Sequence, residues 1–299
     1  MDIPATICAV TGAARATRAA RIQQLWGGWG EIVRYRLDGA AQPSVIVKVV
    51  QPPGRLRRGD RSAARKRRSY QVEAAFYQGH AAQCAARVPA PLHISPGLFV
   101  LEDLDAAGFS GRSGGAAACV DWLADFHAGF LGRAPAGLWP VGTYWHLETR
   151  PDELQSMPRG PLRDAAVALD ARLAGARAQT LLHGDAKRAN FCFGPHSVAA
   201  VDFQYVGGGC GVRDLAYLLG SLLSDAELFR AADPLADRYF ARLRAGLPAD
   251  ADGAAVEAEW RALLPVAWAD FERFLAGWAP GHRSGPYAAA QTRAALRAL

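Results

Sequence analysis

The chain has 299 residues, of which 34 are basic and 28 acidic, so its formal charge is +6, and 51% of its residues are hydrophobic. This composition excludes a disordered chain, and the length allows a large core without disulfide or metal cross-links. The sequence shows no internal repeat and no coiled-coil heptads.

The positive charge is concentrated in one segment. RLRRGDRSAARKRR, from Arg55 to Arg68, holds eight basic residues and one acidic residue, which leaves a charge of −1 for the rest of the chain. One alternative function is therefore a kinase-like scaffold that binds nucleic acid through this segment. The segment has no interleaved aromatic residues for base stacking, and we expect no nucleic-acid partner.

Cysteines and apolar stretches bear on the cellular location. Five scattered cysteines without a C-x-x-C pair predict reduced thiols. The first residues do not have the order of a secretory signal, and no run of about 18 apolar residues could span a bilayer. We therefore expect a cytoplasmic protein without a membrane span.

The first hundred residues predict mixed structure. Residues 12–24 are rich in alanine and arginine and predict a helix, and LWGGWGE then forms a glycine turn. EIVRYRL and SVIVKVV predict a β-hairpin, with Val33, Tyr35 and Leu37 on one face. The basic segment is expected to form a loop and a first helical turn. It leads into the helix SYQVEAAFYQGH, and PLHI and GLFVLEDL predict two further strands.

The remaining chain is predominantly helical in pattern. Helices are predicted over residues 116–131, 161–178, 212–223, 233–245, 253–263, 265–279 and 286–298. Between them, FCF and VAAVDF predict two strands around a GPHS turn. These elements indicate an α+β fold with a small β-rich lobe over 1–103 and a helical lobe over 104–299, and a cleft between lobes favours a ligand site.

Three oxygen-bearing side chains follow one another around the predicted hairpin. Asp185 and Asn190 are separated by a tight turn, and Asp202 follows the next strand. Two carboxylates and one amide oxygen suit Mg²⁺ and do not suit zinc. Aspartate also commonly ends strands and caps turns, but three polar residues closing two apolar strands favour a functional site.

Lysine is scarce, because only Lys48, Lys66 and Lys187 occur. Lys48 is the only charge in the strand VIVKVV, where an unpaired ammonium would be costly to bury. Glu73, on the following helix, is the natural anionic partner. The alternative is that both are solvated, at the ends of an edge strand and a surface helix.

At these residues the chain resembles the aminoglycoside phosphotransferase and choline kinase superfamily, which has the protein-kinase-like bilobal fold. VLEDLDAAGF, HGDAKRANFCF and VDFQYVGGGCGVRDLAYLL carry the resemblance, and they are most similar to ecdysteroid-kinase-like and bacterial choline-kinase-like phosphotransferases. The likeness covers nearly the whole chain. It implies an ATP- and Mg²⁺-dependent kinase that phosphorylates a hydroxyl group of a small molecule.

The resemblance also implies roles for single residues in catalysis. Asp185 would accept the proton of the acceptor hydroxyl, and Lys187 would neutralise the transferred phosphoryl group. Asn190 and Asp202 would hold Mg²⁺.

The nucleotide would be bound by the first lobe, where the resemblance implies three groups of residues. Lys48 and Glu73 would grip the α- and β-phosphates, and a glycine loop would cover the phosphates. An interlobe hinge would read adenine. The residues of the loop and hinge are Gly27, Gly28, Gly30, Glu102 and Leu104.

Three other enzyme classes fit less well. A Walker P-loop is excluded because none of the three lysines follows a glycine. The Gly-Arg-Ser-Gly-Gly match at 111–115 follows a polar, glycine-rich stretch instead of the buried strand that a nucleophile elbow requires. Only eleven residues separate Asp202 from Asp214, which leaves little room for the activation segment of a protein kinase.

The acceptor is expected to bind to the helical lobe. Two stretches are unusual, WPVGTYWHLETRPDEL and PVAWADFERFLAGWAPGH, and their candidate substrate residues are Tyr144, Trp145, Trp268, Asp270 and Trp278. The aromatic residues of the second stretch recur at helical spacing, which favours a core stripe, although tryptophans beside acidic residues could also cage a quaternary ammonium. We expect a choline- or sterol-like alcohol. An antibiotic phosphotransferase is the alternative, although an aminoglycoside site would need many exposed carboxylates.

Overall fold

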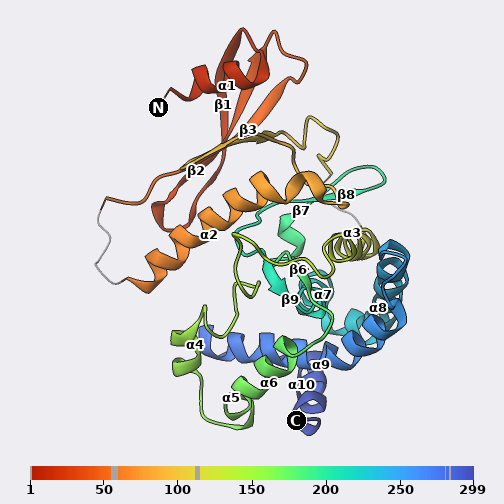
Figure 1. The fold of residues 1–299 in the computed structure, drawn as a ribbon. Helices are drawn as coiled ribbons and strands as arrows, with labels where there is room; N and C mark the ends of the chain where they lie inside the picture. Colours follow the sequence, from red (N-terminus) through yellow and green to blue (C-terminus); the bar gives the residue numbers. More distant parts are fainter. Residues whose placement is uncertain (1, 55–59, 112–114, 280, 283) are drawn as a thin grey trace. The chain divides into compact units, whose positions relative to one another are not determined.

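The structure is a computed structural model and describes residues 2–54, 60–111, 115–279, 281–282 and 284–299 (Figure 1). Contacts divide the chain into two compact units. Unit 1 comprises Met1–Gly114 and Phe191–Gln204, and unit 2 comprises Gly115–Asn190 and Tyr205–Leu299. The expected boundary near residues 102–105 falls inside unit 1, and the functional division into 1–103 and 104–299 stays a prediction.

Unit 1 is built on a five-stranded antiparallel sheet of order β1-β2-β3-β5-β4. Its strands are β1 (Arg15–Gln24), β2 (Gly30–Asp38), β3 (Ser44–Val50), β4 (Pro91–Ser95) and β5 (Leu98–Glu102). The helices α1 (Ile3–Thr11) and α2 (Arg61–Gly79) complete the unit, together with the hairpin of β7 (Phe191–Phe193) and β8 (Val198–Ala200). The predicted hairpin of β2 and β3, the strands β4 and β5 and the hairpin of β7 and β8 are confirmed.

The two faces of the sheet have different partners, because successive side chains of a strand alternate. Val33, Val45 and Val47 lie in one buried cluster with Ile7 of α1. Lys48 lies on the opposite face, in register with Phe99 of β5. On that face the Tyr77 ring of α2 packs edge-on against Phe99. The alternation therefore turns Lys48 towards α2.

The helix predicted over residues 12–24 is wrong. The N-terminal helix is α1, which Asp2 and Gly12 cap at its two ends, and residues 15–24 form the edge strand β1. Nearly all of β1 is exposed, so its side chains carry no alternating apolar pattern. Backbone pairing with β2 overrides the helix propensity of alanine and arginine, and charged side chains suit an exposed sheet edge.

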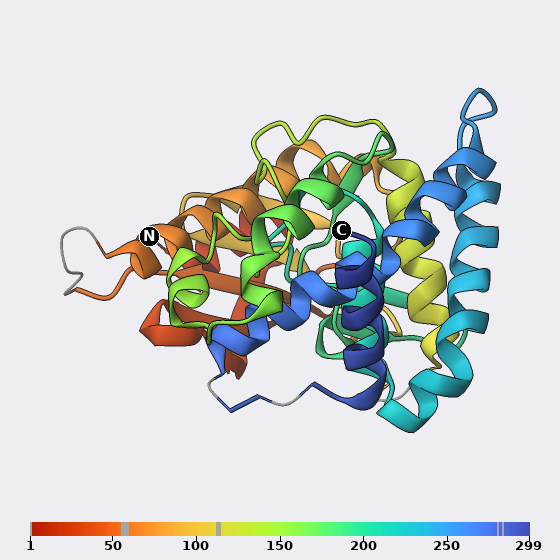
Figure 2. The ribbon, with the colours of Figure 1, turned by 90° about the horizontal axis from the view of Figure 1, so that it is seen from below.

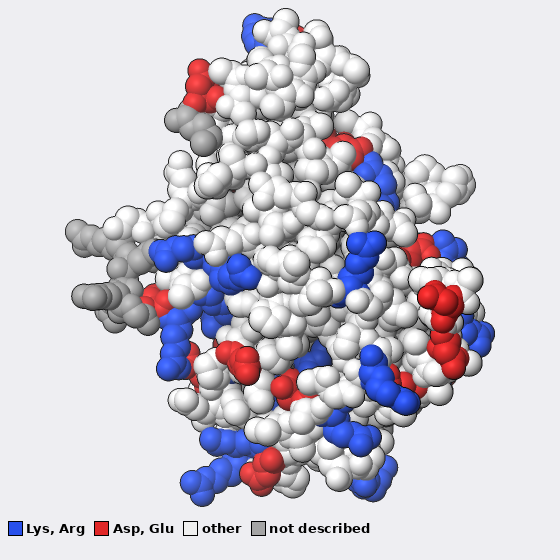
Figure 3. Space-filling model, in the orientation of Figure 1, with Lys and Arg blue, Asp and Glu red and all other residues white. Residues whose placement is uncertain are grey.

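The basic segment is more helical than expected. With Asp60 as its cap, α2 begins at Arg61, so Arg61, Arg65 and Arg67 stand on its first two turns. Blue side chains gather at this end of α2 in Figure 3. Residues 55–59 of the basic segment lie outside the described residues.

Unit 2 is mainly helical. Its helices are α3 (Ala116–Gly129), α4 (Pro151–Ser156), α5 (Pro161–Asp164), α6 (Ala166–Ala174), α7 (Val212–Leu222), α8 (Asp225–Gly246), α9 (Gly253–Trp278) and α10 (Pro286–Arg297). A small sheet pairs β6 (Thr180–Leu182) with β9 (Gly207–Gly209). Figure 2 shows α8 beside α3 and α10 beside α9.

Several helix boundaries in unit 2 differ from those predicted. Pro265 lies inside α9, where two helices were predicted, and Pro234 lies inside α8, which begins at a Ser224 capping box. The helix predicted over 161–178 is broken at Ala165 and ends at Ala174. A proline lowers helix propensity, but packing of α9 against α4, α6, α7 and α10 keeps it continuous. None of the described helices is long and apolar enough to cross a membrane.

Candidate active site

In unit 1, the predicted pair of Lys48 and Glu73 is formed. The Lys48 Nζ lies 2.6 Å from Glu73 Oε2, and the two residues are 4% and 2% exposed. Burial raises the pKa of Glu73, and the charge of Lys48 opposes that rise. The reading of these residues as solvated ends is wrong, because β3 is an inner strand and α2 covers its lysine.

Asp202 reaches the same lysine. Its Oδ1 lies 3.9 Å from Lys48 Nζ, is buried, and accepts no hydrogen bond among the described residues. Its backbone has a φ of +70°, which is uncommon for a residue with a Cβ and is often seen where function requires it. Phe203 beside it stacks on Phe76 of α2 at 4.0 Å, so the segment that follows β8 is held against α2.

The remaining unit 1 candidates occupy two segments. Gly27 and Gly28 belong to the 3₁₀ turn Trp26–Gly28, and Gly30 begins β2. Glu102 ends β5, where its carboxylate pairs with Arg87 at 2.5 Å and accepts the amide of Ala90 at 3.0 Å.

The expected hinge continues with two buried residues after Glu102. Asp103 accepts Arg34 Nε and Ser44 Oγ, both at 2.6 Å, and Leu104 is also buried. The hinge segment is thus anchored by its own side chains, and its contact with adenine stays a prediction.

In unit 2, three side chains hold the carboxylate of Asp185. Its Oδ2 accepts Lys187 Nζ at 2.8 Å and Asn190 Nδ2 at 3.1 Å, and its Oδ1 accepts the hydroxyl of Tyr217 at 3.1 Å. The amide nitrogen of Asn190 also binds the backbone oxygen of Asp185 at 2.9 Å. The predicted residues Asp185, Lys187 and Asn190 are thus brought together, and Tyr217 joins them without having been predicted.

The loop that carries Asp185 is anchored by the first turn of α7. The Asp214 carboxylate accepts the backbone amides of His183 at 2.6 Å and of Gly184 at 3.1 Å. His183 Nδ1 accepts the Asp185 amide at 3.3 Å, so this histidine has a structural part in the loop. His127 is buried in the core and bonds Tyr239 and Asp214.

The candidate acceptor residues fall into two groups. Trp145, Trp268 and Asp270 are at most 3% exposed and are part of the core. Trp278 is 58% exposed and stacks on Phe274. The favoured core position of this stretch agrees with the burial of Trp268 and Asp270, and the alternative, a tryptophan cage for a quaternary ammonium beside Asp270, has no exposed carboxylate there.

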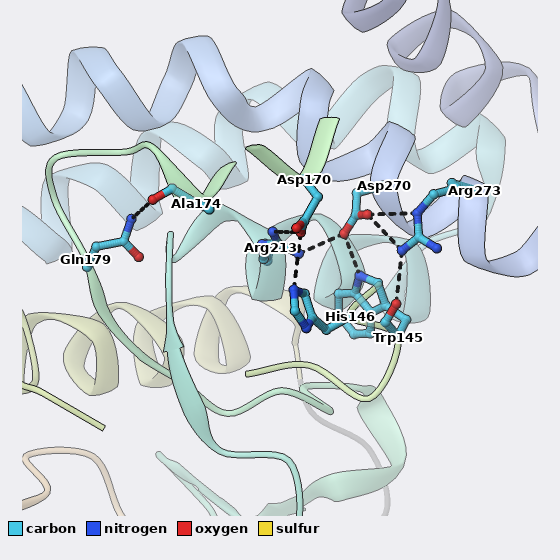
Figure 4. A network of polar contacts seen from close by, with 8 residues as sticks. All are labelled: Trp145, His146, Asp170, Ala174, Gln179, Arg213, Asp270 and Arg273. Carbon is cyan, nitrogen blue, oxygen red and sulfur yellow. Dashed lines mark hydrogen bonds and ion pairs between the residues drawn. The ribbon is translucent and has the colours of Figure 1, made fainter. Parts of the chain in front are cut away.

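Asp270 belongs to a buried polar network (Figure 4). It pairs with Arg213 and with Arg273, each at 2.9 Å, and accepts the Trp145 indole N–H at 3.2 Å. Arg213 also pairs with Asp170 at 2.8 Å, and His146 lies 3.4 Å from the same carboxylate. This network joins α6, α7 and α9. Both carboxylate oxygens of Asp270 accept hydrogen bonds inside it, and the residue is fully buried.

Tyr144 packs against Tyr217, the tyrosine that binds the carboxylate of Asp185. Its ring packs against Tyr217 at 5.6 Å and against Phe274 at 5.4 Å. The guanidinium of Arg150 lies 5.9 Å from the Tyr144 ring centroid and 5.7 Å from that of Phe274. Arg150 is held there by the Tyr144 carbonyl at 2.8 Å and by Glu153 at 3.2 Å.

Two observations bear on the predicted Mg²⁺ ligands, one within each unit. Asp202 offers a buried oxygen without a hydrogen bond, and Asn190 turns its amide nitrogen to Asp185, which leaves the amide oxygen for a cation. In the described part of the chain, no group of three or more His, Cys, Asp and Glu side chains could hold a metal ion. The metal site therefore stays a prediction resting on Asn190 and Asp202.

The fold and these residues define a kinase-like class of phosphotransferase, with a β-sheet N-terminal part that carries a buried Lys–Glu pair and a helical part that carries an oriented aspartate. A model described as the phosphotransferase enzyme family matches residues 21–252, well over half of the chain. The chain belongs to this family, within the aminoglycoside phosphotransferase and choline kinase superfamily, and is a phosphotransferase.

Solved structures agree with this fold. A protein described as a fructosamine-3-kinase of Thermobifida fusca has a TM-score of 0.59 at 18% identity, covering 99% of both chains. A choline kinase of Cryptosporidium parvum has a TM-score of 0.54 at 9% identity, covering 93% of this chain and 88% of that one. An amicoumacin kinase in complex with AMP-PNP and Ca²⁺ has a TM-score of 0.51 at 14% identity, covering 94% and 86%. A search of curated proteins found no match.

Proposed function

We propose that the protein is an ATP- and Mg²⁺-dependent kinase that phosphorylates a hydroxyl group of a small molecule in the cytoplasm. The observation that carries this proposal is the Asp185 carboxylate, held on both oxygens by Tyr217, Lys187 and Asn190. A base held in one orientation is what phosphoryl transfer needs, because the reaction depends on positioning and charge neutralisation. The amicoumacin kinase was solved in complex with AMP-PNP, which supports a nucleotide donor.

Each chemical part has a residue in this chain. Asp185 takes the proton of the acceptor hydroxyl while the acceptor oxygen bonds to the γ-phosphorus and the bond to ADP breaks. Lys187 faces the developing charge, and Lys48, fixed by Glu73, binds the α- and β-phosphates. Asn190 and Asp202 would hold Mg²⁺, which would neutralise phosphate charge when bound.

For the acceptor, we favour a neutral, sterol-like alcohol over a choline-like cation. A cation site needs an open aromatic face, and Arg150 already lies over the rings of Tyr144 and Phe274. It also needs a carboxylate without a counter-ion, and Glu153 and Asp270 are paired with arginines. The same pairing disfavours a polycationic aminoglycoside.

The test of the proposed function is ADP release measured over a panel of hydroxylated metabolites, with Asp185→Asn as the blank. We expect turnover with sterol-like alcohols above that with choline, and no turnover in the blank. Asp185→Asn is expected to retain ATP affinity, because the substitution removes only the base and leaves the pair of Lys48 and Glu73 in place. Turnover in Asp185→Asn equal to that of the parent would refute the base assignment.

A second variant isolates the metal site. Asp202→Ala is expected to lose the Mg²⁺-dependent part of nucleotide binding in calorimetry, because its unbonded oxygen is removed. Asp38→Ala, which changes a largely exposed carboxylate of the same unit, is the control and should bind as the parent does. Unchanged antibiotic susceptibility of a host that carries the gene would argue against the antibiotic-modifying alternative.

A further inference from the structure

We propose that Tyr217 is a positioning residue that orients the carboxylate of Asp185, and that Tyr144 supports the Tyr217 ring. The Tyr217 hydroxyl donates to Asp185 Oδ1 at 3.1 Å. The Tyr144 ring packs against the Tyr217 ring, with the two ring centroids 5.6 Å apart. This inference rests on the proposed role of Asp185 as the base.

Tyr217 complements the donors on the other side of the carboxylate. Lys187 and Asn190 bind Oδ2, whereas Tyr217 binds Oδ1, so the carboxylate is fixed against rotation about its Cβ–Cγ bond. Side chains three apart share one face of a helix, and Asp214 and Tyr217 of α7 both turn to the loop. The helix therefore holds the loop backbone through Asp214 and the base through Tyr217.

The Tyr217 ring cannot easily move. It is 8% exposed and packs against Trp145 at 4.8 Å and Phe271 at 4.9 Å. Trp145 is in turn bonded to Asp270 of the buried polar network. The hydroxyl that reaches Asp185 is thus mounted on the rigid core of unit 2.

Tyr144 is placed by a strained backbone. Thr143 has a φ of +88°, which is an outlier for a β-branched residue, and it is 1% exposed. Its amide donates to the Tyr205 carbonyl at 3.2 Å, and the Tyr144 amide donates to the Gly184 carbonyl at 3.0 Å. Strained residues persist where the surroundings hold them, and here the result is that Tyr144 is docked on the loop of the base.

Both tyrosines stay protonated over the working pH range. Burial raises the pKa of Tyr144 to about 12. Burial, together with the negative charge of Asp185, raises the pKa of Tyr217 further. The Tyr217 hydroxyl therefore remains able to donate to Asp185 Oδ1.

The experiment compares Tyr217→Phe with the parent by steady-state kinetics. Tyr217→Phe is expected to lower kcat about 10- to 100-fold with an unchanged KM for ATP, because a hydrogen bond to a charged group is lost. Urea unfolding is measured alongside, so that the loss of kcat is compared between fully folded proteins.

Tyr287→Phe is the matched control. It removes the hydroxyl of buried Tyr287 from α10, where the ring packs on Trp268 at 5.4 Å, and it should leave kcat unchanged. A parent-like kcat in Tyr217→Phe would overturn the proposal, even if stability fell.

A measurement without turnover separates this inference from the proposed function. Carbon-13 NMR of labelled aspartate, recorded at one constant pH, follows the carboxyl signal of Asp185, assigned by its absence in Asp185→Asn. A shifted or broadened signal in Tyr217→Phe supports positioning, whether or not an acceptor has been found. An unchanged signal overturns it, whereas a changed signal in a protein without Asp185-dependent turnover would contradict only the proposed function.

Discussion

Gly184 shows how one missing Cβ shapes the loop of the base. Its φ is +80°, and a Cβ built there would lie 2.0 Å from the Tyr205 carbonyl oxygen and 2.8 Å from the Thr143 amide nitrogen. The backbone of residues 143 and 205 takes the space that a Cβ would need, so only glycine fits.

We therefore expect Gly184→Ala to abolish turnover and to lower the free energy of unfolding by several kcal/mol, because the clash is with backbone and cannot relax cheaply. Gly132→Ala is the control, since Gly132 has a φ of +73° but nothing within 4 Å of the added Cβ. It should cost only about 1–2 kcal/mol and retain turnover. Urea unfolding and ADP release measure both effects, and equal losses in the two variants would contradict this explanation.

The ionisation of Asp170 makes the stability of the buried polar network depend on pH. Burial opposes its ionisation, but the hydrogen bond from His146 and the charge of Arg213 outweigh that effect and hold the pKa of Asp170 well below its usual value. A carboxylate with a lowered folded-state pKa stabilises the fold above its unfolded pKa of about 3.9, and that contribution is lost as the pH falls towards the folded value.

Asp170→Asn should therefore be less stable than the parent at pH 7, and the difference should shrink below about pH 4. Urea midpoints measured from pH 7 downwards test this. Asp38→Asn, which changes a largely exposed ion pair with Arg15, should differ little from the parent at any pH. A difference for Asp170→Asn that stays constant with pH would show that ionisation of this carboxylate does not stabilise the network.

At the scale of elements, the sequence pattern predicted those elements whose structure depends on residues close together in the chain. Side chains along the hairpin of β2 and β3 alternate between the two faces of the sheet, because one face is buried under α1. Lys48 interrupts an apolar strand, and a buried ammonium needs an anionic partner, which is Glu73. Asp185, Lys187 and Asn190 lie within six residues of one another, so one tight turn suffices to gather them.

The elements that could not be predicted depend on distant contacts. The strand β1 is held by pairing with β2. Its alanines and arginines are nearly all exposed, so they do not show the alternating apolar pattern that would predict a strand. Asp214 and Tyr217 reach the loop from about thirty residues further along the chain, and only tertiary packing places them. An apolar helix with Asp and Tyr three residues apart was the available signal, but many helices share it.

For the whole molecule, the net charge has a local origin and a testable consequence. Arg61→Gln, Arg65→Gln and Arg67→Gln, combined, change three positions on the first turns of α2 and reduce the formal charge from +6 to +3. We expect turnover to persist, because none of the three belongs to the Lys48, Asp202 or Asp185 clusters.

Binding to duplex DNA, titrated across salt concentrations, provides the second measurement for this triple variant. Any residual DNA binding by the parent should be weak and steeply salt-dependent. The slope of log affinity against log salt concentration should be shallower in the triple variant, because three positive charges are removed. Asp121→Asn, at a surface ion pair on α3, controls for a change of surface charge elsewhere. Tight DNA binding by a parent without turnover, lost in the triple variant, would instead favour a nucleic-acid-binding scaffold.

The division of the chain into units has a consequence for synthesis on the ribosome. The hairpin of β7 and β8 belongs to unit 1, where Gly111 pairs with Phe193 and the Ala200 amide donates to the Arg87 carbonyl. About eighty residues of unit 2 are translated between Gly111 and Phe191. At roughly 5–20 residues per second, the first five strands wait roughly 4–16 s for the segment that completes their unit. No single cut in the gene therefore yields a complete unit 1, and Asp202 arrives with its last piece.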